Sequence, residues 1–145
     1  MLNPKFGLGL CTGSPEMTVA IAQISDPVTS SAINSDSKTD KTELTLLKQQ
    51  VFPLGRALSS QGHFCLQEFM AAYPWAHLSW LAIATSGDSL TGVRIGVVTA
   101  RVIGQQCGIP VYGISEVGDV ETLLAIGYAR WQQGDRGDWA DVVPH

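Results

Sequence analysis

Short apolar segments separated by turn residues open the chain. Residues 5–11 and 17–24 are apolar runs of strand length, and the segment 12–16 between them is rich in turn-forming residues. This pattern is typical of two β-strands joined by a short connection. We therefore expect the chain to begin with an antiparallel hairpin.

A long polar segment follows the hairpin. Residues 25–43 are almost all Ser, Thr, Asp and Lys, and Val28 and Ile33 are their only sizeable hydrophobic side chains. So polar a segment predicts a surface loop that contains at most a weak edge strand.

Apolar residues return at helical spacing after this loop. A helix over 43–62 is predicted by apolar side chains that recur every three or four residues, at Leu44, Leu47, Val51, Leu54 and Leu58. Pro53 should kink or interrupt this helix, because proline lacks a backbone donor and crowds the preceding turn. A shorter helix over 64–73 is expected to stop before Pro74.

Strands and helices alternate in the second half of the chain. Buried strands are predicted at 78–85 and 109–115, and helices at 89–108 and 116–134. Ser89 is a suitable N-cap for the long helix, and Gly108 stands where a C-terminal glycine belongs. The tail after residue 134 is expected to be irregular.

The order of the elements indicates the fold class. An opening hairpin is antiparallel, whereas strands that alternate with helices imply parallel crossovers. We therefore expect an α/β domain with a mixed sheet flanked by helices. This layout matches a single lobe of ribonuclease-H-like type, the building block of the actin and Hsp70 ATPases.

Composition limits the partners and the setting of the protein. The net charge is -4 and the arginines are scattered, so strong direct binding of tRNA or another nucleic acid is not expected. The three cysteines are far apart, and no CxxC pair suggests a metal. With no membrane span or signal peptide recognisable, the sequence predicts a reduced, cytoplasmic protein.

The pentapeptide at 87–91, GDSLT, is the signature of a family of serine hydrolases. Such an enzyme needs a general base for its serine. No asparagine follows Asn34, the only histidine after Ser89 is His145 near a tail expected to be irregular, and the motif begins late in the chain. We interpret Ser89 as the start of a helix, with a small serine esterase as the alternative.

Residues 89–115 resemble the signature segment of the TsaB family, the non-catalytic partners in the synthesis of threonylcarbamoyladenosine at position 37 of bacterial tRNA. The matching positions are Ser89, Thr91, Gly92, Arg94, Gly96, Gly108, Ile109, Pro110 and Ser115. The opening segment is similar to the family's first hairpin, and "VFPLGRAL" (51–58) to its first helix. The likeness covers most of residues 6–118.

Three departures from the family pattern bear on function. The family's Gly-Pro-Gly before the serine is Ser86-Gly87-Asp88 here, and Cys11 stands where the family has an aspartate. The sequence shows no counterpart of the family's second lobe, so we expect a TsaB-like first lobe at 1–118 and a closing helix with an irregular tail at 119–145. Cys11 would be a poor magnesium ligand, which favours a pseudo-ATPase without a cofactor of its own.

The resemblance implies partners rather than catalysis. We expect docking on a TsaD-type ATPase, with a TsaE-type ATPase as a further candidate partner and a homodimer for the isolated chain. Nucleotide, ATP or ADP, would bind only at an interface. Neither catalytic nor metal-binding residues are assigned. A third hypothesis is a diverged homodimeric paralogue with no role in tRNA modification.

Small residues recur along the long helix and suggest a contact surface. Gly92, Gly96, Ala100 and Gly104 are four residues apart and share one helix face, hereafter the glycine strip. It suits close approach of either the domain's own sheet or a partner. We assign the partner interface to this strip together with Leu47, Val51 and Leu54 of the expected first helix, beside the motif loop of Ser89, Thr91, Gly92 and Arg94.

Overall fold

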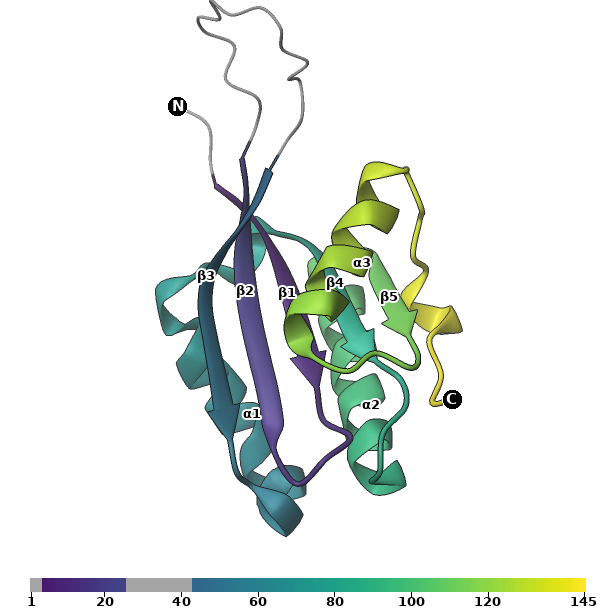
Figure 1. Cartoon of the computed structure of the whole chain (residues 1–145). Coiled ribbons are helices and arrows are strands. Elements are labelled where there is room, and N and C mark those ends of the chain that lie inside the picture. Colours follow the sequence, from purple (N-terminus) through teal and green to yellow (C-terminus); the bar gives the residue numbers. More distant parts are fainter. Residues whose placement is uncertain (1–3, 26–42) are drawn as a thin grey trace, which may run out of the picture.

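The computed structural model describes residues 4–25 and 43–145 and contains one five-stranded mixed sheet (Figure 1). The strands are β1 (Lys5–Cys11), β2 (Met17–Ser25), β3 (Glu43–Phe52), β4 (Leu78–Ala84) and β5 (Val111–Ile114). Their order across the sheet is β3-β2-β1-β4-β5. The pairs β1–β2 and β2–β3 are antiparallel, whereas β1–β4 and β4–β5 are parallel. The predicted hairpin and the predicted mixed sheet are confirmed.

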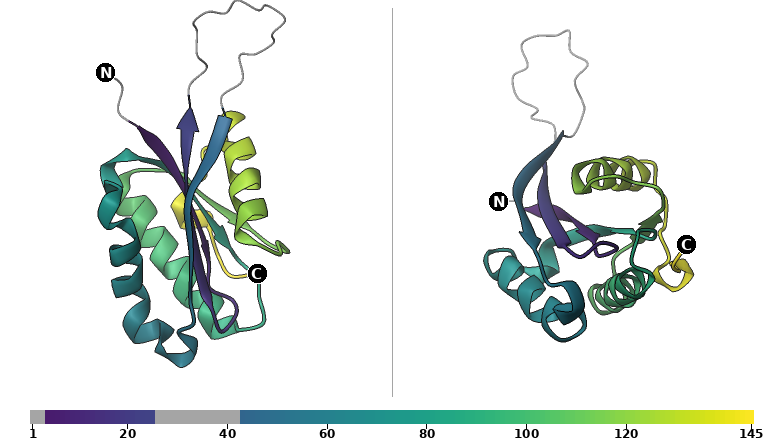
Figure 2. Two further views of the ribbon diagram at one scale, coloured as in Figure 1. Left: turned by 60° about the vertical axis from the view of Figure 1, so that its left-hand side comes forward. Right: turned by 60° about the horizontal axis from the view of Figure 1, so that its bottom comes forward.

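Within the described residues, three helices cover the two faces of the sheet. Helices α1 (Leu58–Phe69) and α2 (Leu90–Cys107) lie on one face, and α3 (Val120–Gln132) lies on the other (Figure 2). Short 3-10 turns at Gly55–Ala57, Met70–Ala72, Trp75–His77 and Trp139–Asp141 connect or follow these elements. None of the described helices has the length and apolar character needed to cross a membrane.

The prediction of a helix over 43–62 is wrong in its first half. Residues 43–52 pair with β2 along their whole length, and only Leu58–Phe69 form a helix. This helix also includes residues 64–69, the start of the segment expected to form a separate helix at 64–73. Gly62 is buried against Leu58 and does not interrupt the helix. The expected weak strand around Val28 and Ile33 lies outside the described residues.

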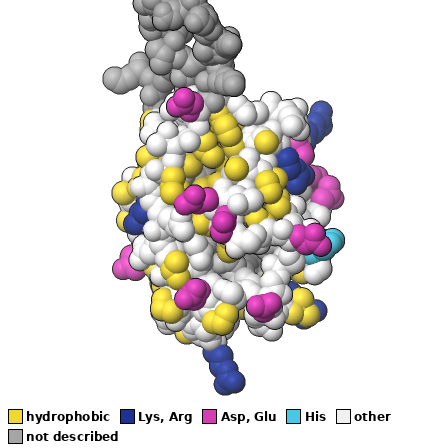
Figure 3. All heavy atoms as spheres, viewed as in Figure 1, with side chains coloured by type: hydrophobic (Ala, Val, Ile, Leu, Met, Phe, Trp, Pro, Cys, Tyr) yellow, Lys and Arg dark blue, Asp and Glu magenta, His cyan; other side chains and the backbone are white. Residues whose placement is uncertain are grey.

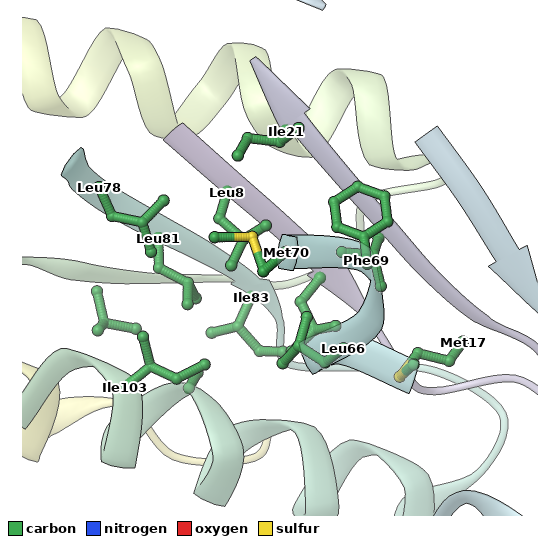
Figure 4. Packing of buried hydrophobic residues seen from close by; sticks show 14 of the residues in the cluster. Leu8, Met17, Ile21, Leu66, Phe69, Met70, Leu78, Leu81, Ile83 and Ile103 are labelled. Carbon is green, nitrogen blue, oxygen red and sulfur yellow. The ribbon is translucent and has the colours of Figure 1, made fainter. Parts of the chain in front are cut away.

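A buried apolar core fills the space between the sheet and the α1–α2 layer. Figure 4 shows Leu8, Ile21, Leu81 and Ile83 of the strands among side chains of the helical layer, including Ile103 of α2. The strands alternate in the side chains that they present to the two faces. Burial of these apolar side chains is the main stabilising contribution in a domain of this size.

On the opposite face, α3 packs over one large aromatic side chain. Trp80 of β4 is fully buried, and its ring fills the space beside Gly7 of β1 and Gly127 of α3. A Cβ atom added at Gly127 would come within 2.7 Å of this ring, and one added at Gly7 would overlap it. The absence of side chains at both positions therefore lets the helix lie close to the sheet.

The glycine strip of α2 is buried against the protein's own sheet. A Cβ atom at Gly92 or Gly96 would collide with Thr12 at the end of β1, and one at Gly104 would collide with Val111 of β5. Ala100 is also fully buried. The prediction that this strip forms a partner interface is wrong, because its close approach serves the domain's own core.

The ends of α2 and the tail lie close to the sheet. Ser89 caps the helix and Gly108 ends it in the left-handed conformation, with φ 67°, as expected. In the tail after α3, the Gly137 carbonyl accepts a hydrogen bond from the Val111 N–H of β5 at 2.8 Å, and the His145 N–H donates to the Thr85 carbonyl at 2.8 Å. The tail is thus mostly irregular, as predicted, and hydrogen bonds to β5 and to the loop after β4.

We expect Gly92→Ala to destabilise the protein by roughly 1–2 kcal/mol in urea unfolding. Overpacking costs about 1–3 kcal/mol, which outweighs the gain of about 1 kcal/mol from replacing a helical glycine. The added carbon meets the backbone oxygen of Thr12, which cannot swing aside. Gly118→Ala is the matched control because nothing lies near its new carbon; equal stability of the two variants would contradict this packing.

Candidate functional site

Two loops meet where β1 and β4 end, at the start of α2. The Thr12 hydroxyl donates to the Gly92 carbonyl at 2.7 Å, in a buried position. The Ser89 N–H donates to the Gly13 carbonyl at 2.9 Å. A Cβ atom at Gly87 would lie 2.6 Å from the Gly13 carbonyl oxygen, so the contact between the two loops requires glycine there.

A groove of about 410 Å³ lies beside this junction, between the first turns of α1 and α2. It is lined by Ser14, Pro15, Gly55, Arg56, Leu58, Ser59, Ser89, Thr91, Gly92 and Ile95. Its lining combines four hydroxyl-bearing residues and Arg56 with the apolar residues Pro15, Leu58 and Ile95. These described lining residues include no carboxylate, imidazole or thiol, so they supply none of the usual general acids or bases.

The motif residues divide between this groove and the surface. Ser89, Thr91 and Gly92 line the groove, whereas Arg94 is exposed and lies outside it. The Ser89 side chain accepts a hydrogen bond from the Gly92 N–H at 3.0 Å, which is the geometry of a helix N-cap. The interpretation of Ser89 as the start of a helix is confirmed.

Two of the histidines pack beside aromatic rings. His63 stacks on Phe64 with ring centroids 4.1 Å apart, and His77 packs near Phe6. Within residues 4–25 and 43–145, neither imidazole hydrogen bonds to Ser89.

Cys11 is the last residue of β1. It stands where the TsaB family, which the sequence resembles, has an aspartate. Burial, together with the nearby negative charge of Asp119, raises the pKa of the Cys11 thiol to about 11. The thiol is therefore neutral near pH 7, and a neutral thiol is a poor ligand for magnesium. In the described part of the chain, no three His, Cys, Asp or Glu side chains come together as a metal site would require.

Asp119 caps α3 on the other side of the sheet. Its carboxylate accepts a hydrogen bond from the Thr122 N–H at 2.7 Å. Hydrogen bonding to Thr122 lowers the pKa of Asp119. Asp119 is thus fully charged in the alkaline range where Cys11 would ionise.

The remaining predicted interface residues do not gather around the glycine strip. Leu47 and Val51 lie on β3 and are 39% and 45% exposed. Leu54 lies in the turn after β3, where it is partly buried against the core. The expected first helix does not exist over these residues, so they form no shared helical surface with α2.

An exposed apolar face of α2 escaped the sequence-based assignment. Leu90, Val98 and Val102 are 52%, 61% and 51% exposed, and the exposed Arg94 lies between them in the sequence. These four residues, hereafter the outer face of α2, are offset by two positions from the glycine strip. Two residues turn a helix by about 200°, so these four residues lie on the face opposite the glycine strip. They also recur every four residues in the sequence, and this spacing could have revealed them.

We expect Ser89→Ala to lower the free energy of unfolding by about 1 kcal/mol, the usual cost of losing an N-cap. Ser89→Asn should stay within a few tenths of a kcal/mol of the wild type, because asparagine also caps helices. Urea unfolding measures both. The wild type should hydrolyse a chromogenic ester no faster than the uncatalysed background. Protein-dependent hydrolysis that both substitutions abolish would show that Ser89 does more than cap the helix.

We expect the Cys11 thiol to react with iodoacetamide at pH 8 more than about 100-fold slower than a cysteine in an unfolded peptide. With a pKa of about 11, its thiolate fraction at pH 8 is about one in a thousand, against roughly one in four for an ordinary thiol. Asp119→Asn keeps the cap and removes the charge, so it should accelerate the reaction. Peptide mass spectrometry resolves the three cysteines, and rapid labelling of Cys11 in the folded protein would contradict the expectation.

No family model and no curated protein matches this chain. YeaZ from Pseudomonas aeruginosa is similar in structure at 18% identity and a TM-score of 0.48, over 90% of this chain. The match covers 52% of that chain, so this protein spans about half its length.

A second likeness concerns the fold. T. thermophilus RuvC, solved in complex with a Holliday junction substrate, matches over 91% of this chain and 98% of its own, at 13% identity and a TM-score of 0.56. The PPX-GPPA enzyme of Aquifex aeolicus matches over 78% of this chain at 10% identity and a TM-score of 0.35. The strand order, the mixed sheet and the helices on both faces agree with the predicted class: the chain has a ribonuclease-H-like fold with a single lobe.

Proposed function

We propose that this chain is a non-catalytic binding partner of a TsaD-type ATPase and supports the formation of threonylcarbamoyladenosine in tRNA. The likeness of residues 89–115 to the TsaB signature suggests the pathway. The observation that carries a binding role is the outer face of α2, where three apolar side chains are each more than half exposed. The proposed docking surface replaces the buried glycine strip.

The spacing of the outer face suits a helix-mediated contact. Isolated exposed apolar residues are common on proteins, but residues four apart on one helix form a continuous stripe. Phe64 of α1, on the same side of the sheet, is also 56% exposed. An apolar stripe of this kind is typical of docking between helices. Arg94 within it would favour an acidic residue on the partner.

The proposed division of labour leaves nucleic acid and chemistry to the partner. The net charge of -4 disfavours strong phosphate binding by this chain. Cys11 does not fit a magnesium ion, because its thiol is protonated near neutral pH. ATP or ADP is therefore proposed to bind only at an interface with the partner, and a TsaE-type ATPase is a candidate third component.

We expect the chain to form a one-to-one complex with the TsaD-type protein of its host, and Val98→Glu to weaken that complex by about 30-fold or more. A buried charge at the centre of an interface costs 2 kcal/mol or more. Light scattering coupled to size exclusion gives the stoichiometry, and calorimetry gives the affinity. Ile126→Glu on α3 is the control, since Ile126 is also exposed but lies on the opposite side of the sheet.

The tRNA role is tested separately in the host. Deleting the chain should lower the threonylcarbamoyladenosine content of tRNA measured by mass spectrometry, and the Ile126→Glu variant should restore it better than Val98→Glu. A complex that forms equally well with Val98→Glu would refute the docking surface. Unchanged tRNA modification after deletion would instead favour a diverged paralogue.

A further inference from the structure

β3 forms one edge of the sheet, and its outer side faces no other strand among the described residues (Figure 1). It is the longest of the described strands, with ten residues. The backbone N–H and C=O groups that point away from β2 are therefore available to another strand. Leu46 and Val51 are 42% and 45% exposed on this strand, and Figure 3 shows hydrophobic side chains on the face of the molecule seen in Figure 1, where β3 and α3 lie.

Pairing with β2 assigns the residues of β3 to the two faces of the sheet. Leu44, Leu46 and Gln49 lie opposite Ile24, Ala22 and Ala20, which belong to the α3-side core; Val51, two residues beyond Gln49, shares that face. Thr45, Lys48, Gln50 and Phe52 occupy the other face, and the partners of the last three, Ile21, Val19 and Met17, belong to the core beneath α1 and α2.

An irregularity in the ladder changes the symmetry of this pattern. The register passes from Ile21 opposite Lys48 to Ala22 opposite Leu46, which leaves Leu47 as an extra residue. In a regular strand, two residues at equal distances on either side of a peptide bond lie on opposite faces of the sheet. The extra residue removes that mismatch. Counted outward from the Leu47–Lys48 bond, residues at equal distances toward the two ends of β3 lie on the same face.

This symmetry selects one register for pairing β3 with a second copy of itself. In an antiparallel pair centred between Leu47 and Lys48, Leu46 meets Gln49 and Leu44 meets Val51 on the α3 side. Thr45 meets Gln50 and Glu43 meets Phe52 on the other side. A shift of one residue in either direction would place residues of opposite faces against each other.

The side chains on the strand are compatible with that register. Glu43 and Lys48 are its only charged residues; with Leu47 as the extra residue, the two Lys48 side chains face each other across the centre of the pair, and like charges oppose pairing. An edge lysine often prevents unwanted pairing, but the Lys48 ammonium lies 4.7 Å from the Phe69 ring centroid, over its own core. Each copy would also bring one exposed Val51 against a Leu44 of the other.

We propose that two copies of this chain associate through β3, antiparallel and centred between Leu47 and Lys48, so that their sheets continue into one. This surface is independent of the docking proposed on α2, because α2 packs on β4, β1 and β5. One strand pair with its flanking side chains makes a small interface, so association in the micromolar range is expected.

The register is tested by disulfide trapping in the full-length protein. Leu44→Cys combined with Val51→Cys places two thiols seven residues apart on one strand, about 20 Å, too far for a bond within one copy. In the proposed dimer the same thiols lie opposite each other, and oxidation should yield a covalent dimer. Leu44→Cys with Gln50→Cys is the matched control, because Gln50 lies on the other face; the wild type controls for the native cysteines.

Association without cross-linking is measured by sedimentation equilibrium over roughly 10–500 μM. We expect Leu46→Lys to weaken the dimer by about tenfold or more, and Val98→Glu to leave it unchanged; circular dichroism checks that both variants fold. A wild type that stays monomeric at every concentration would overturn the proposal. So would equal trapping of the two double-cysteine variants, or a dimer dissociated by Val98→Glu and not by Leu46→Lys.

Discussion

The contact between the end of β1 and the start of α2 is the constraint on which the rest of the structure depends. The Thr12 hydroxyl binds the Gly92 carbonyl in a buried position, and neither Gly92 nor Gly96 leaves room for a side chain beside Thr12. This contact fixes the distance of α2 from the sheet. It also brings the loops after β1 and β4 together, and so forms one wall of the groove.

Much of the fold could be predicted from periodicity and punctuation alone. The hairpin, β4, α2, β5 and α3 are marked by clear apolar runs and by Ser89 and Gly108 at the ends of the long helix. β3 could not be recognised because its extra residue, Leu47, interrupts the alternation of period two. Leu44, Leu47 and Val51 then fall three and four residues apart, which is the spacing of a helix.

The candidate site was predictable in its residues but not in its orientation. A strip of small residues suits close packing equally well against a sheet or a partner, and the sequence does not say which face of α2 is turned inward. The structure turns the glycine strip inward and leaves Val98 and Val102 exposed. The pairing of Gly13 with Gly87 was missed because their close approach depends on two loops that are distant in sequence.

The packing around Trp80 links three distant positions into one volume. Its indole occupies space that side chains at Gly7 and Gly127 would otherwise fill, so the three residues can change only in a compensated way. A smaller residue at position 80 would leave a void that a methyl group at position 7 or 127 could partly refill. Among diverging copies of this chain, these positions should therefore vary together, and their joint variation would mark how closely α3 is held to the sheet.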